Sequence, residues 1–172
     1  IFLHSCVGLT SFDALITILA KNEYKYIISV PLAIGLSNAV RAVALMFGPV
    51  FLSKYVTKEN LHYLLIFQGL SIILWGFMQS NFYISLIALF IVGLSTTTLW
   101  SFTYALLQDN CDERYIGRVI SYNDMFFMLS CVVTTLFIGL MASLTSVDII
   151  TILLGVGFLA FAFYYTRILK WI

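Results

Sequence analysis

Charged residues are scarce in this sequence. Lys, Arg, Asp and Glu make up 10% of the 172 residues, whereas soluble domains carry roughly 25%. Hydrophobic residues make up 62%, so a soluble domain of this length would lack the polar groups to cover its surface. The apolar residues must therefore face a lipid bilayer, and the net charge of +1 gives no indication of a nucleic-acid partner.

Motifs for metal binding and for hydrolysis are also missing. The three cysteines (Cys6, Cys111 and Cys131) have the spacing of neither a metal site nor a disulfide framework. His4 and His62 fall near the ends of apolar segments, where we expect them to be interfacial, and no His-Glu or Gly-x-Ser-Gly motif occurs. We therefore expect no cofactor, no metal and no enzymatic activity.

Six apolar segments are each long enough to cross a bilayer, which takes about 20 residues. They cover about 1–20, 27–52, 61–78, 82–107, 119–144 and 149–169. The segments are apolar on all sides rather than striped, and they lack the alternation of a β-barrel, so we predict an all-α integral membrane fold. The sequence begins at Ile1 without an initiator Met or a basic leader, so we expect a fragment of a longer protein.

Basic residues are distributed unequally between the gaps that separate these segments. Gaps two and four and the C-terminal tail hold Lys54, Lys58, Arg114, Arg118, Arg167 and Lys170. Gaps one, three and five hold only Lys21 and Lys25. Because positively charged loops stay on the cytoplasmic side, we expect a multi-pass protein of the cytoplasmic (inner) membrane with both ends in the cytoplasm.

The charged residues Asp13 and Arg41 fall inside the first and second apolar segments. Each costs about 2.5–3.5 kcal/mol near a helix centre, so both should face protein or water. Helical spacing places Thr10 and Thr17 on the face of Asp13, and Asn38 on the face of Arg41. Their expected depths differ by roughly 9 Å, a gap that a long Arg side chain can span. The group forms either a substrate or proton pathway or a structural ion pair.

Hydroxyl and aromatic side chains concentrate in the fourth apolar segment. They include Thr97, Trp100, Ser101 and Tyr104. Such side chains suit a substrate of mixed polarity, but Ser and Thr also bond their own backbone or a neighbouring helix, and both interpretations stay open. Gln68 in the third segment and Gly155 and Gly157 in the sixth are predicted to serve helix packing.

The longest polar stretch lies between the fourth and fifth segments. It contains Gln108, the acidic residues Asp112 and Glu113, Arg114, and the run Gly117-Arg118-Val119. The acidic pair favours a helix N-terminus, the two arginines lie one turn apart, and Gly117 permits close helix approach. This stretch either sets topology alone or also latches one conformation.

The same residues resemble the loop between the tenth and eleventh helices of bacterial exporters of the major facilitator superfamily. The branch they resemble most contains macrolide and siderophore efflux proteins. The hydropathy layout extends the resemblance over the whole chain, as the seventh to twelfth helices. The resemblance implies the C-terminal six-helix half of a major facilitator fold, with its N-terminal half missing.

The resemblance further implies a secondary active transporter that exports a small molecule by alternating access. Its partners would be the bilayer, the missing half, a small-molecule substrate and, through Asp13, protons. The fourth segment then lines the central cavity. The expected translocation pathway comprises Asp13, Arg41, Asn38, Thr10, Thr17, Thr97, Trp100, Ser101 and Tyr104, and the expected cytoplasmic latch comprises Gln108, Asp112, Glu113, Arg114, Gly117 and Arg118. A channel or membrane scaffold subunit, and less so an intramembrane enzyme, are the alternatives.

Overall fold

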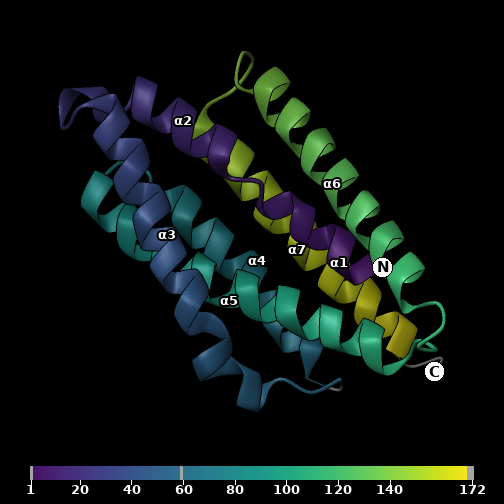
Figure 1. Ribbon diagram of the computed structural model, residues 1–172. Helices are drawn as coiled ribbons and strands as arrows, with labels where there is room; N and C mark the ends of the chain where they lie inside the picture. Colours follow the sequence, from purple (N-terminus) through teal and green to yellow (C-terminus); the bar gives the residue numbers. More distant parts are fainter. Residues whose placement is uncertain (1, 59, 170–172) are drawn as a thin grey trace.

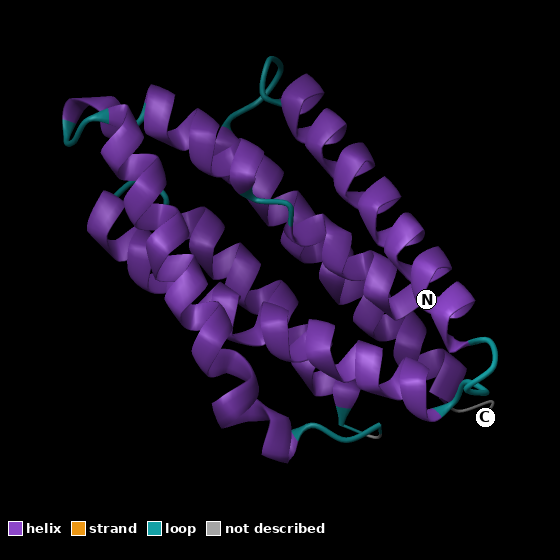
Figure 2. Ribbon diagram, viewed as in Figure 1, coloured by secondary structure: helices purple, strands orange, loops and turns teal. Residues whose placement is uncertain are grey.

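The computed structural model describes residues 2–58 and 60–169, and this part of the chain consists of helices and short connections without strands (Figure 1, Figure 2). Ile1 of the first expected span and Lys170 of the basic count lie outside the described residues. Five described segments are long and apolar enough to cross a membrane: Val30–Tyr55, Leu61–Met78, Phe82–Asp109, Ile116–Met141 and Val147–Arg167. This is the architecture of an all-α membrane protein.

The helices follow the predicted segments closely, except at the start of the chain. In order they are α1 (Phe2–Val7), η1 (Gly8–Thr10), α2 (Asp13–Asn22), η2 (Tyr24–Tyr26), α3 (Val30–Leu52), η3 (Ser53–Tyr55), α4 (Leu61–Met78), α5 (Phe82–Asp109), α6 (Ile116–Met141) and α7 (Val147–Leu169). The first expected span is therefore not one continuous helix. It is divided into α1, η1 and α2, with Ser11 and Phe12 outside any helix.

Local sequence explains where several helices begin. The side chain of Asn81 accepts hydrogen bonds from the amides of Tyr83 (3.1 Å) and Ile84 (3.4 Å), which caps the N-terminus of α5. Ser29 has an extended backbone ahead of α3, and Pro31 stands in the first turn, where its missing N–H costs no hydrogen bond.

Four of the long helices, α3, α5, α4 and α7, pack side by side in that order. α3 packs along α5, α5 contacts α4, and α4 packs along α7. α6 meets this row mainly through α1 and η1. In Figure 1 the connections after α2 and between α6 and α7 lie at the upper end of the bundle, while the connections after α3 and α5 lie at the lower end.

At each end of the bundle, side-chain hydrogen bonds join segments that are distant in the sequence. At one end the Tyr24 hydroxyl donates to the Gln79 carbonyl (2.9 Å), and Gln79 Nε2 donates to Thr151 Oγ1 (2.8 Å). Burial raises the pKa of Tyr24, which keeps its hydroxyl protonated as a donor. At the other end the Tyr165 hydroxyl donates to the Lys58 carbonyl (3.4 Å). Because successive connections lie at opposite ends of the bundle, consecutive long helices run in opposite directions (Figure 1).

Glycines stand where helix backbones approach most closely. A Cβ at Gly155 of α7 would lie 2.9 Å from the Gly69 carbonyl oxygen of α4, and a Cβ at Gly93 of α5 would lie 3.1 Å from the Arg41 carbonyl oxygen of α3. The packing role predicted for Gly155 is confirmed. Gly157 is not at such a contact, because its nearest neighbour is Leu9 Cδ1 at 3.9 Å. At Gly117 no such contact occurs within the described residues, because no atom beyond its chain neighbours and its own helix backbone lies within 4 Å of a Cβ placed there, and close approach to a further helix stays a prediction.

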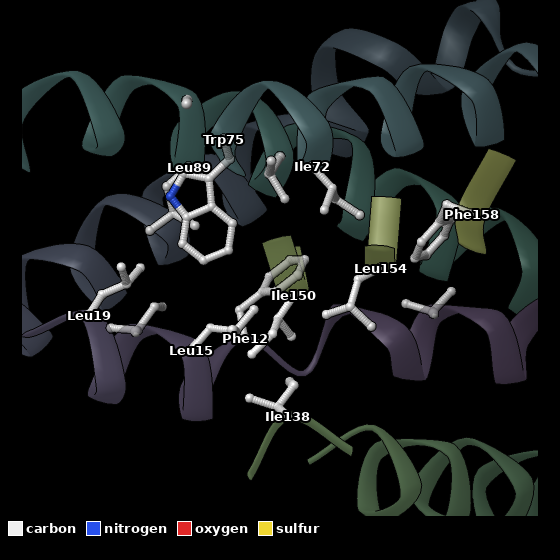
Figure 3. Packing of buried hydrophobic residues seen from close by; sticks show 14 of the residues in the cluster. Phe12, Leu15, Leu19, Ile72, Trp75, Leu89, Ile138, Ile150, Leu154 and Phe158 are labelled. Carbon is white, nitrogen blue, oxygen red and sulfur yellow. The ribbon is translucent and has the colours of Figure 1, made fainter. Parts of the chain in front are cut away.

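Large side chains from distant segments fill the space between the helices (Figure 3). Phe12, at the interruption of the first segment, packs edge-on against Trp75 of α4 with ring centroids 5.1 Å apart. Trp75 Nε1 donates to Ser85 Oγ at 3.0 Å, which satisfies its polar group. Gln68 of α4 is fully buried and donates to Thr96 Oγ1 of α5 (3.1 Å), so the packing role predicted for Gln68 is confirmed.

The outer faces of α3 and α6 are apolar and exposed. These are the two least buried of the five long segments. Their exposed side chains include Met46, Val50 and Phe51 on α3, and Met128, Val132, Leu136 and Leu140 on α6. Surfaces of this kind require lipid or another protein segment as their neighbour.

We predict that Gly155→Ala lowers the free energy of unfolding by about 1–3 kcal/mol, because the added methyl group meets Ile73 and the backbone of α4. Thermal unfolding of the detergent-solubilised chain measures the change. Gly139→Ala is the matched control, since nothing lies within 4 Å of a Cβ at Gly139 and both changes gain helix propensity equally. Equal unfolding temperatures for the two variants would contradict this account of the α4–α7 contact.

Candidate functional site

The break in the first apolar segment is built from hydrogen bonds that compete with a regular helix. The Thr10 hydroxyl donates to the Val7 carbonyl (2.7 Å), which satisfies an acceptor at the end of α1. The amides of Ser11 and Phe12 donate to the carbonyls of Gly8 (3.2 Å) and Thr10 (2.7 Å). In apolar surroundings, the backbone groups that an interrupted helix frees need internal partners of this kind.

Two contacts fix the position of the break. Ser11 Oγ lies 3.2 Å from Thr135 Oγ1 of α6, and the Phe12 ring is buried against Trp75. Figure 3 shows Phe12 beside the non-helical connection, within the group of buried side chains. α2 then begins at Asp13, whose carboxylate lies at the positive end of the new helix.

A cavity of about 370 Å³ opens beside this break, and we call it the break cavity. Its polar side chains are those of Thr10, Ser11, Asp13, Arg41, Thr96 and Thr97. Its remaining lining residues are Val7, Phe12, Leu45, Trp100, Phe127 and Cys131. The lining therefore comes from α1, η1, α2, α3, α5 and α6, and it combines a few polar groups with an apolar wall, as small-molecule sites do.

An ion pair lies in the wall of the break cavity. Arg41 Nη2 is 3.3 Å from Asp13 Oδ1, so the two charges found from the sequence do meet. Arg41 lies near the middle of the 23-residue α3, and its side chain is 23% exposed. The side chain of Asp13 is 68% exposed, so the pair is open to whatever fills the cavity. An ion pair with one exposed member contributes little to stability.

Polar atoms around this ion pair remain unsatisfied. Arg41 Nη1, Thr97 Oγ1 and Asn38 Oδ1 are buried, and none has a hydrogen-bond partner among the described residues. Buried polar atoms without partners are costly, and they mark places where a water or a ligand stabilises the site.

A second polar group lies behind the aromatic wall of the cavity. His4 is only 1% exposed, so the interfacial position predicted for it was wrong. Its Nδ1 lies 3.0 Å from Thr103 Oγ1, and its ring packs edge-on against Trp100 (4.5 Å) and Tyr104 (4.6 Å). His4 Nε2 is buried without a partner among the described residues.

Asp124 belongs to the same group, and the sequence analysis missed it. The Tyr104 hydroxyl donates a hydrogen bond to Asp124 Oδ1, which joins α5 to α6. The neighbouring Asn123 is 1% exposed, and neither polar atom of its amide has a partner in the described part of the chain. An acidic residue inside the fifth apolar segment was the available signal.

The break cavity gathers five of the nine residues predicted to form a pathway: Thr10, Asp13, Arg41, Thr97 and Trp100. Tyr104 lies just outside, stacked on Trp100 at 5.8 Å. Thr17, Asn38 and Ser101 do not line the cavity. Thr17 lies one turn after Asp13 in α2, and its hydroxyl donates to the Asp13 carbonyl (2.7 Å).

The polar stretch between α5 and α6 is exposed throughout its predicted latch residues. These are Gln108, Asp112, Glu113, Arg114, Gly117 and Arg118. The Arg114 amide donates to Asp112 Oδ1 (3.1 Å), which stabilises the turn ahead of α6. Within the described residues neither arginine side chain forms an ion pair, so both guanidinium groups are available to a partner.

No group of three or more His, Cys, Asp and Glu side chains with metal-binding geometry occurs in the described part of the chain. Comparisons with protein-family models, with curated proteins and with solved structures found no match to this chain. The function must therefore be argued from the site itself.

We predict that Tyr104→Phe lowers stability by about 1–3 kcal/mol, because the Asp124 carboxylate loses a donor in partly apolar surroundings. Tyr122→Phe is the matched control on α6, since Tyr122 is 59% exposed. The two variants are compared by thermal unfolding in the same detergent. Equal unfolding temperatures for Tyr104→Phe and Tyr122→Phe would show that the hydrogen bond contributes nothing to stability.

Proposed function

We propose that this chain is the C-terminal half of a secondary active transporter of the major facilitator type, which exports a small molecule by alternating access. The observation that carries the proposal is the break cavity. An interrupted helix places an ion pair and unsatisfied polar atoms beside a hollow within an apolar bundle. Transporters bind substrates and coupling ions at interrupted helices of this kind, near the middle of the membrane.

The depth of the site supports this assignment. Asp13 stands at the middle of the stretch from Phe2 to Asn22, and Thr97 lies near the middle of the 28-residue α5. The stretch formed by α1, η1 and α2 is roughly 30 Å long at 1.5 Å per residue, which matches the hydrocarbon core. We propose that it crosses the membrane as a sixth, interrupted span.

The alternation of helix direction supports the proposed orientation. The connections after α3 and α5 carry Lys54, Lys58, Arg114 and Arg118, and the end of α7 carries Arg167. The opposite end holds Lys21 and Lys25. We place the more basic end and both termini in the cytoplasm, in the inner membrane.

The exposed apolar faces support a missing partner. α3 and α6 each contribute to the wall of the break cavity, and they are also the least buried long segments. We propose that the N-terminal half covers part of these faces and closes the cavity from its open side. In this arrangement the exposed stretch from Gln108 to Arg118 pairs with that half in one conformation, as the latch predicted from the sequence.

We predict that the cavity is reached from both sides of the membrane. In the complete protein without its native cysteines, the thiol introduced by Thr97→Cys should react with an impermeant reagent in right-side-out and in inside-out vesicles. Ser101→Cys is the control, because Ser101 is on the same helix but outside the cavity. No reaction from either side would favour a scaffold, and ion conductance across a planar bilayer would favour a channel.

We predict the topology through one native and one introduced cysteine. In intact cells Cys111, between α5 and α6, should be protected from an impermeant thiol reagent. The thiol of Asn81→Cys, between α4 and α5, should react. Cys6 and Cys131 are replaced in both proteins so that they give no background. The opposite labelling pattern would reverse the proposed orientation.

A further inference from the structure

The guanidinium group of Arg41 has more donors than acceptors around it. Asp13 contacts it through a single pair of atoms 3.3 Å apart, whereas paired arginine and carboxylate groups commonly form two parallel hydrogen bonds at about 2.7–2.9 Å. Nη1 is buried without a partner among the described residues. The site is therefore short of an acceptor, and a second planar anion beside Arg41 would supply it.

Thr97 provides a second donor for such an anion. Its hydroxyl is buried and unpartnered, whereas the neighbouring Thr96 hydroxyl donates to the Val92 carbonyl (2.8 Å) and accepts from Gln68. Thr97 and Arg41 both line the break cavity, and Asp13 is the one carboxylate in its lining. The missing acceptor must therefore come from a ligand or from water.

The apolar part of the cavity lining determines which kind of ligand body fits beside the anionic group. Val7, Phe12, Leu45, Trp100 and Phe127 form an apolar and partly aromatic wall. A volume of about 370 Å³ is at the lower end of the range of small-molecule sites. A small organic acid with an apolar or aromatic body fits both the wall and the donors.

Charge balance ties this ligand to a proton. Asp13 and Arg41 together are neutral, so an added anion would leave one uncompensated negative charge at membrane depth, which is costly. Protonation of Asp13 removes that charge and releases Arg41 Nη2 for the ligand. The charge therefore stays balanced only if anion and proton bind together.

No other charged group adjoins Asp13 in the described residues of the cavity wall. α3 presents Arg41, α6 presents the Cys131 thiol, and α5 presents uncharged side chains. His4, Tyr104 and Asp124 lie behind Trp100 and Phe127. Lys21 lies at the far end of α2, and Glu23 follows that end. Glu23 and Asp148 of α7 line a separate cavity there.

We propose that the break cavity binds a small organic carboxylate on Arg41 and Thr97, together with one proton on Asp13. That this anion is the transported substrate rests on the function proposed above, while the binding itself is measured without transport. Anion binding without two-sided access at Thr97 would leave this proposal standing and refute the transporter. Two-sided access without anion binding would do the reverse.

The probe is 2-naphthoate, with neutral 2-naphthamide as its isostere, and binding to the detergent-solubilised chain is followed by equilibrium dialysis. Measurements at about pH 5.5 and about pH 8 keep the naphthoate ionised throughout. We expect naphthoate to bind about tenfold or more tightly than naphthamide, as hydrogen bonds to charged groups allow. We also expect naphthoate to bind more tightly at the lower pH.

The variants separate the two roles. Arg41→Gln should bind naphthoate and naphthamide alike, and its naphthamide binding shows that the cavity is intact. Asp13→Asn should bind naphthoate equally at both pH values. Arg167→Gln, which changes an exposed arginine at the end of α7, should behave as the unchanged protein. Equal binding of the two probes by the unchanged protein, preference retained in Arg41→Gln, or pH dependence retained in Asp13→Asn would overturn the proposal.

Discussion

The break at Ser11 and Phe12 exists only because the chain satisfies the backbone groups that the break frees. In apolar surroundings each unpaired N–H or C=O costs several kcal/mol, so an interrupted helix needs internal partners. The Thr10 hydroxyl and the short turn of η1 supply them, and buried Phe12 fixes the turn in the core. The ion pair, the cavity and the start of α2 all depend on this one local arrangement.

Two polar groups result, with an aromatic wall between them. On one side Asp13 and Arg41 face the break cavity. On the other side His4 and Tyr104 contact Trp100, and Tyr104 holds Asp124. Trp100 therefore lies between the ion pair of the cavity and the polar side chains of His4 and Tyr104.

Much of the fold could be predicted from the sequence, because lipid imposes a simple rule on helix length and apolarity. The prediction for α4 agrees with the structure at both ends, Leu61 and Met78, and the other long helices differ by a few residues. The break could not be predicted, since neither Pro nor Gly stands at Ser11 or Phe12. Local hydrogen bonds of Thr10, Ser11 and Phe12 satisfy the break, but the contacts that fix its position, to Thr135 and Trp75, come from distant segments.

The candidate site was predictable in part for the same reason. A charge inside an apolar segment must be covered, which pointed to Asp13 and Arg41 without any structure. His4 was misplaced because its partners come from α5 and α6, so its distance from the end of the segment was no guide. Asp124 lies inside the fifth predicted segment and could have been found by the same rule, but its partner Tyr104 comes from α5 and is visible only in the structure.

The position of the cavity relative to the exposed helices ties these features together. α3 and α6 both line the break cavity, and the same two helices are the least buried of the five long segments. Arg41 Nη1 and Thr97 Oγ1 are already buried without partners among the described residues, which is costly unless the adjoining cavity supplies a partner. The cavity leaves room for the water or ligand that these atoms lack, and in the transporter proposed above the missing half would close it.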